Sequence, residues 1–378
     1  MMVKTKLREV RDQLGYSAAE VIRMLLRRAS MLGIGVMSAT SLKTKLSVWE
    51  NGHESVSEPY QRLFRDIYGR INEELGFPPE QQDSEAFELR SRLAVARTVD
   101  AGTVELFRRQ VNDARHADQR FGGITLLDQL RSSAKQVEDV LTYGAGRGWR
   151  QQLAAVLTEA STLAGWLALD RNAVGQAWTH YERAKAAARE ADSTALLAHA
   201  TAEQAFVLVD IGDTSQAVEQ FAEARRLAER TTPPLLRAWL AAAHGEGLAA
   251  ANQRDEALRA FDAADALLPS NPVDPELPFV FLAGVHLDRW RGHAAAQLGE
   301  PEAVARLAAA LPRLPPTFVR AKTRMLVDLA FAYAAAGDRD AALEHSRQAR
   351  RLGSQIKSDR QLRRLGSLIL PGSASGVA

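Results

Sequence analysis

The segments AWTHYERA (177–184), AVEQFAEA (217–224) and ALRAFDAA (257–264) repeat one pattern of alanine, aromatic ring and alanine at fixed spacing. Successive copies are 40 residues apart, and weaker copies begin at Ala303 and Ala342. A fixed period of a few tens of residues indicates a stack of similar supersecondary units. A small residue lies about twelve positions before each copy, at Gly165, Ala205, Gly245, Gly292 and Ala330.

This region has the period of an α-helix and almost no strand-like alternation. We interpret each unit as two antiparallel helices whose small residues allow close packing, with the ring filling the gap to the next pair. One pair cannot bury its apolar face alone, so several must stack. The sequence predicts about five helix pairs over 151–357, in a repeat domain at 151–370, and a disordered tail at 371–378. The proline-rich segment at 269–278 either bends the stack or merely connects two pairs.

The composition is typical of a folded soluble protein, with 46% hydrophobic and 25% charged residues and a net charge of +2. The absence of cysteine excludes disulfides, thiol nucleophiles and cysteine zinc sites. The first residues alternate in charge and do not resemble a signal peptide. The most apolar run, FVFLAGV (279–285), is far shorter than the ~18 residues that a membrane helix needs. We therefore expect a cytoplasmic protein with no membrane contact.

The start of the chain is basic. Residues 1–53 hold nine basic and four acidic side chains, a net charge of +5, whereas the rest of the chain is slightly acidic. This asymmetry is expected of a small nucleic-acid-binding module carried by a larger domain. Helical periodicity predicts an all-α bundle over 6–68, within a domain at 1–77 that ends at consecutive prolines. Residues 78–150 are charged and helical in pattern, and we expect a linker or coupling region there.

Local signals place the helices of the bundle. Ser17 and Glu20 fit a capping box at the start of a second helix. The apolar residues of segment 25–40 suggest that this helix is long and that a tucked-in loop follows it. A third helix is expected from about Thr40 to Trp49, and a fourth from near Pro59.

The segment SLKTKLSVWENG (41–52) resembles the recognition helix and turn of the lambda-repressor-like (XRE-type) helix-turn-helix family. The resemblance covers roughly 60 residues, including EPYQRLFRDIYG (58–69), which is similar to the closing helix of that family. It implies that the polar part of the helix enters the major groove of double-stranded DNA. Trp49 is expected in the core. The residues implied as DNA contacts are Ser41, Lys43, Thr44, Lys45 and Ser47, and a solvated helix face is the alternative for each.

Two features depart from the family pattern. The connection between the second and third helices is long, and Ala18 occupies the place of the usual phosphate-binding glutamine. A head that has lost DNA binding therefore stays an alternative.

The repeats resemble tetratricopeptide repeats with somewhat long helices, which implies a concave surface lined by the first helix of each pair. Aromatic and charged residues on such a surface suit a peptide, a partner protein or an apolar small molecule with polar ends. For Phe206 and Trp239, packing between pairs is the alternative. The side chains that the repeat register points into the groove are Trp166, Asp170, His199, Phe206, Asp210, Trp239, Glu246, Arg289, His293, Arg324 and Phe331.

No pattern of catalysis is found. GAGRGW (144–149) has neither the lysine nor the preceding strand of a phosphate-binding loop. His286 and His293 would share a helix face, but no third ligand is apparent. We expect a protein that is not an enzyme and that uses no metal and no cofactor.

A helix-turn-helix head on tetratricopeptide-like repeats resembles bacterial transcription regulators of actinobacterial type, in which a signal bound to the repeats changes DNA binding. The 40 arginines against eight lysines fit a GC-rich genome. Such heads usually act as homodimers because two half-sites need two recognition helices. The alternative is a protein-interaction scaffold whose head docks a protein partner.

Overall fold

Each predicted repeat folds as a pair of α-helices in the computed structural model, which describes residues 5–78, 84–123, 126–144, 147–229, 232–282 and 285–371. Within these residues the regular structure is helical throughout, with one short 3₁₀ turn, so the all-α prediction is confirmed. The chain divides into two units, Met1–Ser91 and Arg92–Ala378.

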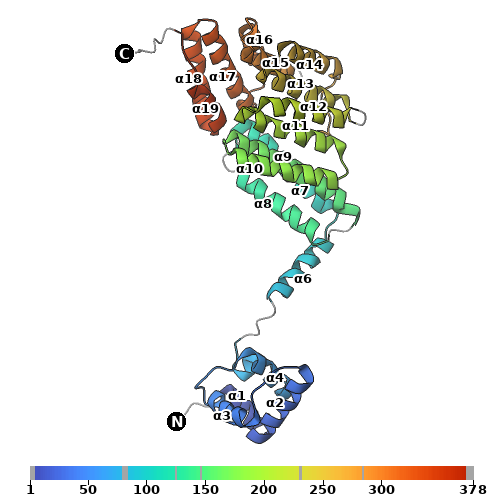
Figure 1. Ribbon diagram of the computed structural model, residues 1–378, viewed down its shortest axis with the longest axis vertical. Coiled ribbons are helices and arrows are strands. Elements are labelled where there is room, and N and C mark those ends of the chain that lie inside the picture. Colours follow the sequence, from blue (N-terminus) through green and yellow to red (C-terminus); the bar gives the residue numbers. More distant parts are fainter. Residues whose placement is uncertain are drawn as a thin grey trace, which may run out of the picture. The chain divides into compact units, whose positions relative to one another are not determined.

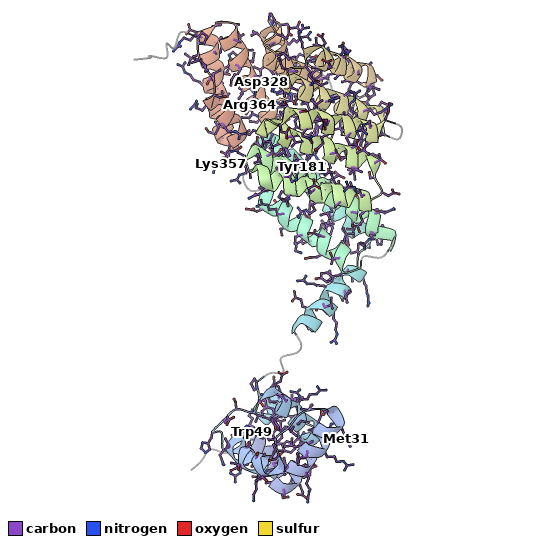
Figure 2. All side chains as sticks on the ribbon, in the orientation of Figure 1. Met31, Trp49, Tyr181, Asp328, Lys357 and Arg364 are labelled. Carbon is purple, nitrogen blue, oxygen red and sulfur yellow. The ribbon has the colours of Figure 1, made fainter. Side chains whose placement is uncertain are left out.

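Unit 1 is the predicted helical bundle. Ser17 and Glu20 form the expected capping box, and Trp49 is almost fully buried in the core. Ile34 and Met37 of the loop after the second helix pack on this core, whereas Met31 is exposed on the helix itself (Figure 2). The helices are α1 (Lys6–Gln13), α2 (Ala18–Leu32), α3 (Ala39–Glu50), α4 (Glu58–Tyr68) and α5 (Asn72–Leu75). A further helix, α6 (Ser84–Arg97), crosses the boundary between the units.

Unit 2 contains five helix pairs in the predicted places, and the pairs from α9 to α16 lie side by side in chain order (Figure 1). This arrangement is compatible with an α-solenoid. Its pairs are α9 (Arg147–Asp170) with α10 (Val174–Glu190), α11 (Thr194–Ile211) with α12 (Thr214–Ala228), α13 (Pro234–Ala250) with α14 (Arg254–Leu267), α15 (Val285–Gln297) with α16 (Ala303–Ala310), and α17 (Val319–Ala335) with α18 (Arg339–Ile356).

A separate linker region was expected at 78–150, whereas in the structure most of these residues are packed into unit 2. α7 (Ala101–Phe121) and α8 (Leu126–Thr142) both pack against α9 and belong to unit 2. Their apolar side chains, Val111, Leu130 and Val137 among them, join the main core of that unit. The hydrophobic faces of α7 and α8 are thus buried against the first helix pair. The predicted disordered tail lies almost wholly outside the described residues.

The repeated small residues and rings pack as a set, and the rings contact both their own pair and, as predicted, the next one. A Cβ added at Gly165 would lie 2.8 Å from the ring of Tyr181, and one added at Gly245 would lie 2.8 Å from Phe261. Each of these rings therefore packs against the glycine of its own pair. The Tyr181 hydroxyl then reaches the next pair, where it donates to Glu203 at 3.4 Å.

Short turns join the helices of a pair, as in the sequences after Ile211 and Ala336. Gly212 and Gly337 adopt φ of 85° and 84°, a left-handed conformation that ends the first helix without a Cβ clash. The carboxylates of Asp213 and Asp338 then accept from backbone N–H groups of the second helix. These turns fix the antiparallel course of each pair.

Gly247→Ala is expected to lower the free energy of unfolding of unit 2 by about 1–3 kcal/mol, because the added methyl would lie 2.5 Å from the buried ring of Phe221. Alanine alone would favour an exposed helix by up to about 1 kcal/mol. Gly175→Ala, at an exposed helical position with nothing within 4 Å, is the matched control and should be neutral or stabilising. Urea denaturation of both variants tests this, and equal midpoints would contradict the packing argument.

Candidate functional site

The third helix of unit 1, α3, has one buried and one exposed face. Ser38 caps its start by accepting from the Ser41 amide at 3.3 Å. Leu42, Leu46 and Trp49 point into the core, at the four- and three-residue spacing of one helix face. The opposite face is polar and available to a partner.

The structure places the five predicted DNA contacts on or near this polar face. Ser41, Lys43, Thr44 and Ser47 are exposed. Lys45 is half-buried, and its ammonium group contacts Glu54 at 2.7 Å, so its charge is already partly compensated. The pair of Lys45 with Glu54 was not predicted, because no role was expected for the turn that follows α3.

The two residues after Trp49, Glu50 and Asn51, contact side chains of α1. The Arg11 guanidinium donates to the Glu50 carboxylate at 2.6 Å, and this hydrogen bond, opposed by burial, raises the pKa of Arg11. Arg8 donates to the Asn51 side chain at 3.0 Å. Both contacts tie α1 to the end of α3. The Trp49 ring packs on other core rings, 4.9 Å from Tyr60 between centroids, as its predicted core position requires.

Unit 2 contains a partly open cavity of about 200 Å³. Its wall comes mostly from the first helices of the pairs, together with α7, the segment 279–281 and the last helix, α19 (Asp359–Gly366). Seven of the predicted groove residues line it: Trp166, Asp170, His199, Phe206, Trp239, Arg289 and Arg324.

The other predicted groove residues lie elsewhere. Asp210, Glu246 and His293 line an adjoining cavity that shares Phe206 with the first. Phe331 lines neither cavity; it packs with apolar side chains near the end of the stack, beside the Arg364 guanidinium.

For Phe206 and Trp239 both interpretations hold in part. Phe206 meets the Trp290 ring edge-on at 6.4 Å between centroids, and Trp239 lies 5.7 Å from Trp290. These side chains pack between pairs and form the cavity wall at the same time. Phe279 also lines the cavity but was not predicted as a groove residue. The only sequence signal for it is the apolar run that begins at this residue.

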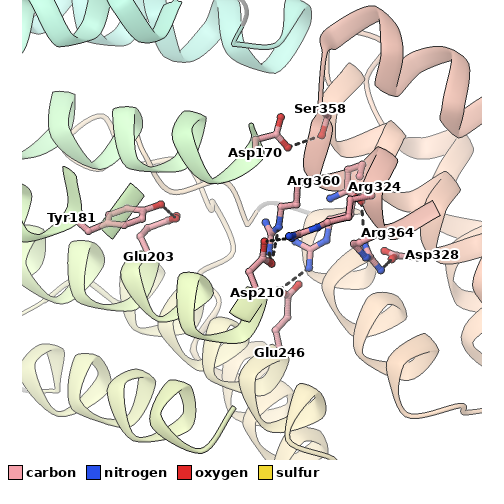
Figure 3. A network of polar contacts seen from close by, with 12 residues as sticks. Asp170, Tyr181, Glu203, Asp210, Glu246, Arg324, Asp328, Ser358, Arg360 and Arg364 are labelled. Atoms are coloured by element: carbon pink, nitrogen blue, oxygen red, sulfur yellow. Dashed lines mark hydrogen bonds and ion pairs between the residues drawn. The ribbon is translucent and has the colours of Figure 1, made fainter. Parts of the chain in front are cut away.

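The side of unit 2 that carries the two cavities is partly closed by its last helices. The last helices cross to the first ones, so that α17 contacts α7 and α19 contacts α9. Figure 3 shows the polar network at this closure. Arg320 forms ion pairs with Asp118 and Asp170, and Ser358 donates to Asp170 at 2.6 Å. The network continues through Arg360 with Asp210 at 2.6 Å, Arg324 with Glu246 at 2.8 Å, and Arg364 with Asp328 at 2.8 Å.

Several charges that the sequence assigned to a ligand are therefore used inside the protein. Asp170, Asp210, Glu246 and Arg324 are in ion pairs, and His293 contacts Asp328 at 2.9 Å. Sequence reasoning could not find these partners because each lies far away along the chain.

Burial dominates the electrostatics of the cavity. It raises the pKa of Glu203 to about 7, a rise that the Tyr181 hydroxyl only partly offsets. It lowers the pKa of His199 to about 3, and neighbouring Arg115 adds to this. At neutral pH the imidazole is therefore uncharged, and about half of the Glu203 carboxyl groups are protonated.

Among the described residues, no group of three or more histidine, aspartate or glutamate side chains is arranged to hold a metal ion. His286 and His293 lie in different surroundings, because His286 packs 4.9 Å from Phe318 and His293 contacts Asp328. One described segment, Gly148–Asp170, is long and apolar enough to cross a membrane. Its apolar window is 78% buried inside the protein, as in the core helix of a soluble domain.

Comparison with known proteins assigns no family to the chain, so the candidate site is identified from the contacts described above. No family model matches the chain, and no curated protein shows a significant match.

Proposed function

We propose that this protein is a transcription regulator that binds double-stranded DNA through α3 of unit 1 and a signal molecule through the cavity of unit 2. The observation that carries the proposal is the polar face of α3, where Ser41, Lys43, Thr44 and Ser47 are exposed opposite a fully buried stripe. Hydroxyl and ammonium groups at the start of a helix can contact both base edges and phosphates.

The cavity of unit 2 supports the sensing part of the proposal. Aromatic walls with a few polar groups are typical of sites for small organic ligands. In a homodimer, ligand binding would favour one spacing of the two heads and so change operator affinity by population shift. The proposed activity involves no catalysis.

The alternative is a protein-interaction scaffold whose head docks a protein. The ion pair of Lys45 with Glu54 favours it, because this pair lowers the positive charge available to phosphates. The two functions differ in salt dependence, since binding through phosphates weakens steeply as salt rises.

Lys43→Ala is expected to weaken DNA binding about three- to tenfold and to reduce the slope of log affinity against log salt by about one. Lys45→Ala should have a smaller effect, because Glu54 already neutralises part of its charge. Fluorescence anisotropy with duplex DNA from upstream of the protein's own gene, at low and moderate salt, measures both.

Lys135→Ala, at an exposed ion-paired site in unit 2, is the matched control and should bind like wild type. Scrambled DNA controls for sequence preference. Equal affinities of wild type for both DNAs, unchanged by Lys43→Ala, would count against the regulator and direct attention to protein partners of the head.

A further inference from the structure

Arg289 of α15 differs from the other arginines at the cavity. It is only 9% exposed and lines the cavity. Its Nε has no hydrogen-bond partner, and among the described residues the guanidinium forms no ion pair. The other cavity arginines each contact a carboxylate: Arg115 with Glu159, Arg320 with Asp118 and Asp170, Arg324 with Glu246, and Arg360 with Asp210.

A buried charge without a partner is costly in free energy unless something else compensates it. Burial lowers the pKa of Arg289 to about 10, and the charge of Arg324 contributes to this, yet the guanidinium is still protonated at neutral pH. The cavity thus presents a buried positive group that has no ion-pair partner among the described residues. Glu246 and Asp328 act on it only from beyond ion-pair distance, and its guanidinium lies 5.9 Å from the centre of the Trp290 ring. A planar guanidinium offers two parallel N–H donors to a carboxylate or a similar oxyanion.

The surroundings of Arg289 are apolar and aromatic. The His199 ring lies 4.8 Å from Trp239 and 4.4 Å from Phe279 between centroids, and Trp239 lies 5.7 Å from Trp290. All four rings line the same cavity. Such walls suit a flat or hydrophobic ligand body. Among the acidic residues that line the cavity, Glu203 has no arginine or lysine in an ion pair with it, and its neighbour His199 is neutral. Because its pKa is raised to about 7, Glu203 repels an anion less than an ordinary glutamate would.

We infer that the cavity binds an organic anion, whose carboxylate or other oxyanion pairs with Arg289 and whose apolar body lies against Trp239, Phe279 and Trp290. This inference rests on the proposed ligand-binding role of unit 2, and it names the chemical class of the ligand. It does not depend on what unit 1 binds.

The test uses two fluorescent probes that share one skeleton. 1-Anilinonaphthalene-8-sulfonate carries an anionic group, and N-phenyl-1-naphthylamine is its neutral counterpart. We expect the full-length protein to bind the anionic probe at least about tenfold more tightly, as a charged hydrogen bond allows. Arg289→Gln should remove this preference while it leaves the affinity for the neutral probe within about twofold.

Three further variants make the result specific. Arg291→Gln, two residues further along α15 but paired with Asp262 and outside the cavity wall, should behave like wild type. Arg289→Lys should keep part of the preference, which separates loss of charge from loss of folding. Phe279→Ala should weaken both probes, because it removes part of the apolar wall.

The inference is overturned if wild type shows no preference for the anionic probe, or if Arg289→Gln leaves that preference unchanged. Thermal unfolding followed by circular dichroism confirms that each variant is folded. Because no DNA is present, these results are independent of the anisotropy experiment, and failure of one proposal is distinguishable from failure of the other.

Discussion

Acidification from pH 7 to pH 5 is expected to lower the free energy of unfolding of unit 2 by on the order of 5 kcal/mol. Burial lowers the pKa of five histidines in this unit, each with a contribution from a nearby arginine; at His293 the carboxylates of Asp328 and Glu246 oppose this. The resulting pKa is about 4 for His180 and His244 and about 3 for His199 and His286, against 6.5 for an ordinary histidine.

The sign follows from proton binding. Above pH 6.5 these rings are neutral in both the folded and the unfolded chain, so they have no effect. Below pH 6.5 the unfolded chain takes up protons that the folded protein excludes, so stability falls until the pH reaches the folded pKa values. Glu203 opposes this in part, since its pKa is raised to about 7 and its proton stabilises the folded state as the pH falls toward 4.5.

Hydrogen-bond geometry supports neutral rings at two of these sites. His180 Nδ1 lies 3.1 Å from an Arg183 nitrogen, and His244 Nδ1 lies 3.1 Å from an Arg225 nitrogen. An arginine can only donate, so each Nδ1 must accept and carry no proton. Protonation would break both contacts and place two positive charges together.

Urea denaturation at a series of pH values measures the effect. A double variant, His180→Gln with His244→Gln, should reduce the slope of stability against pH by about two protons. His116→Gln, at an exposed position of α7, is the matched control. A double variant with the slope of wild type would show that these two rings are not the source of the acid sensitivity.

Arg320→Ala is expected to destabilise unit 2 by about 3–5 kcal/mol. The guanidinium is buried between Asp118 of α7 and Asp170 of α9, and both carboxylates are themselves buried. Without Arg320, Asp118 and Asp170 stay buried and repel each other, and no other basic side chain contacts them so closely. Burial and the charge of Asp170 already push the pKa of Asp118 upward, so removal of Arg320 leaves a costly pair.

Equilibrium denaturation in urea measures this loss. Arg313→Ala is the control, because Arg313 pairs at 2.8 Å with Asp288 and both side chains are largely exposed; its effect should stay below about 1 kcal/mol. Equal losses in the two variants would mean that the contact between α17 and the first helices contributes little to stability.

Local patterns explain why the sequence predicted the helix pairs so well. A ring and a small residue sixteen positions apart meet within one pair, as Tyr181 and Gly165 do. Caps and turns such as Ser17 with Glu20, or Gly212 with Asp213, act within a few residues. These interactions are encoded by short spacings, so they can be recognised without the fold.

The cavity was predictable only in part. The repeat register placed Trp166, His199 and Trp239 on one side of the helices, and all three line the cavity. It could not show that Asp170 meets Ser358 or that Asp210 meets Arg360, because 188 and 150 residues separate these partners. No periodicity in the chain refers to such contacts.

The sequence by itself therefore determined an all-α protein with a small helical head and a stack of helix pairs, because hydrophobic period, caps and small-residue spacing are local properties. Only the tertiary structure decided that α17 and α19 fold back onto α7 and α9, that α7 and α8 belong to the stack, and that most groove charges are neutralised internally. The physical reason is that these contacts join residues far apart along the chain, which no local pattern encodes. The same long-range packing leaves one buried arginine of the cavity, Arg289, without an ion-pair partner among the described residues.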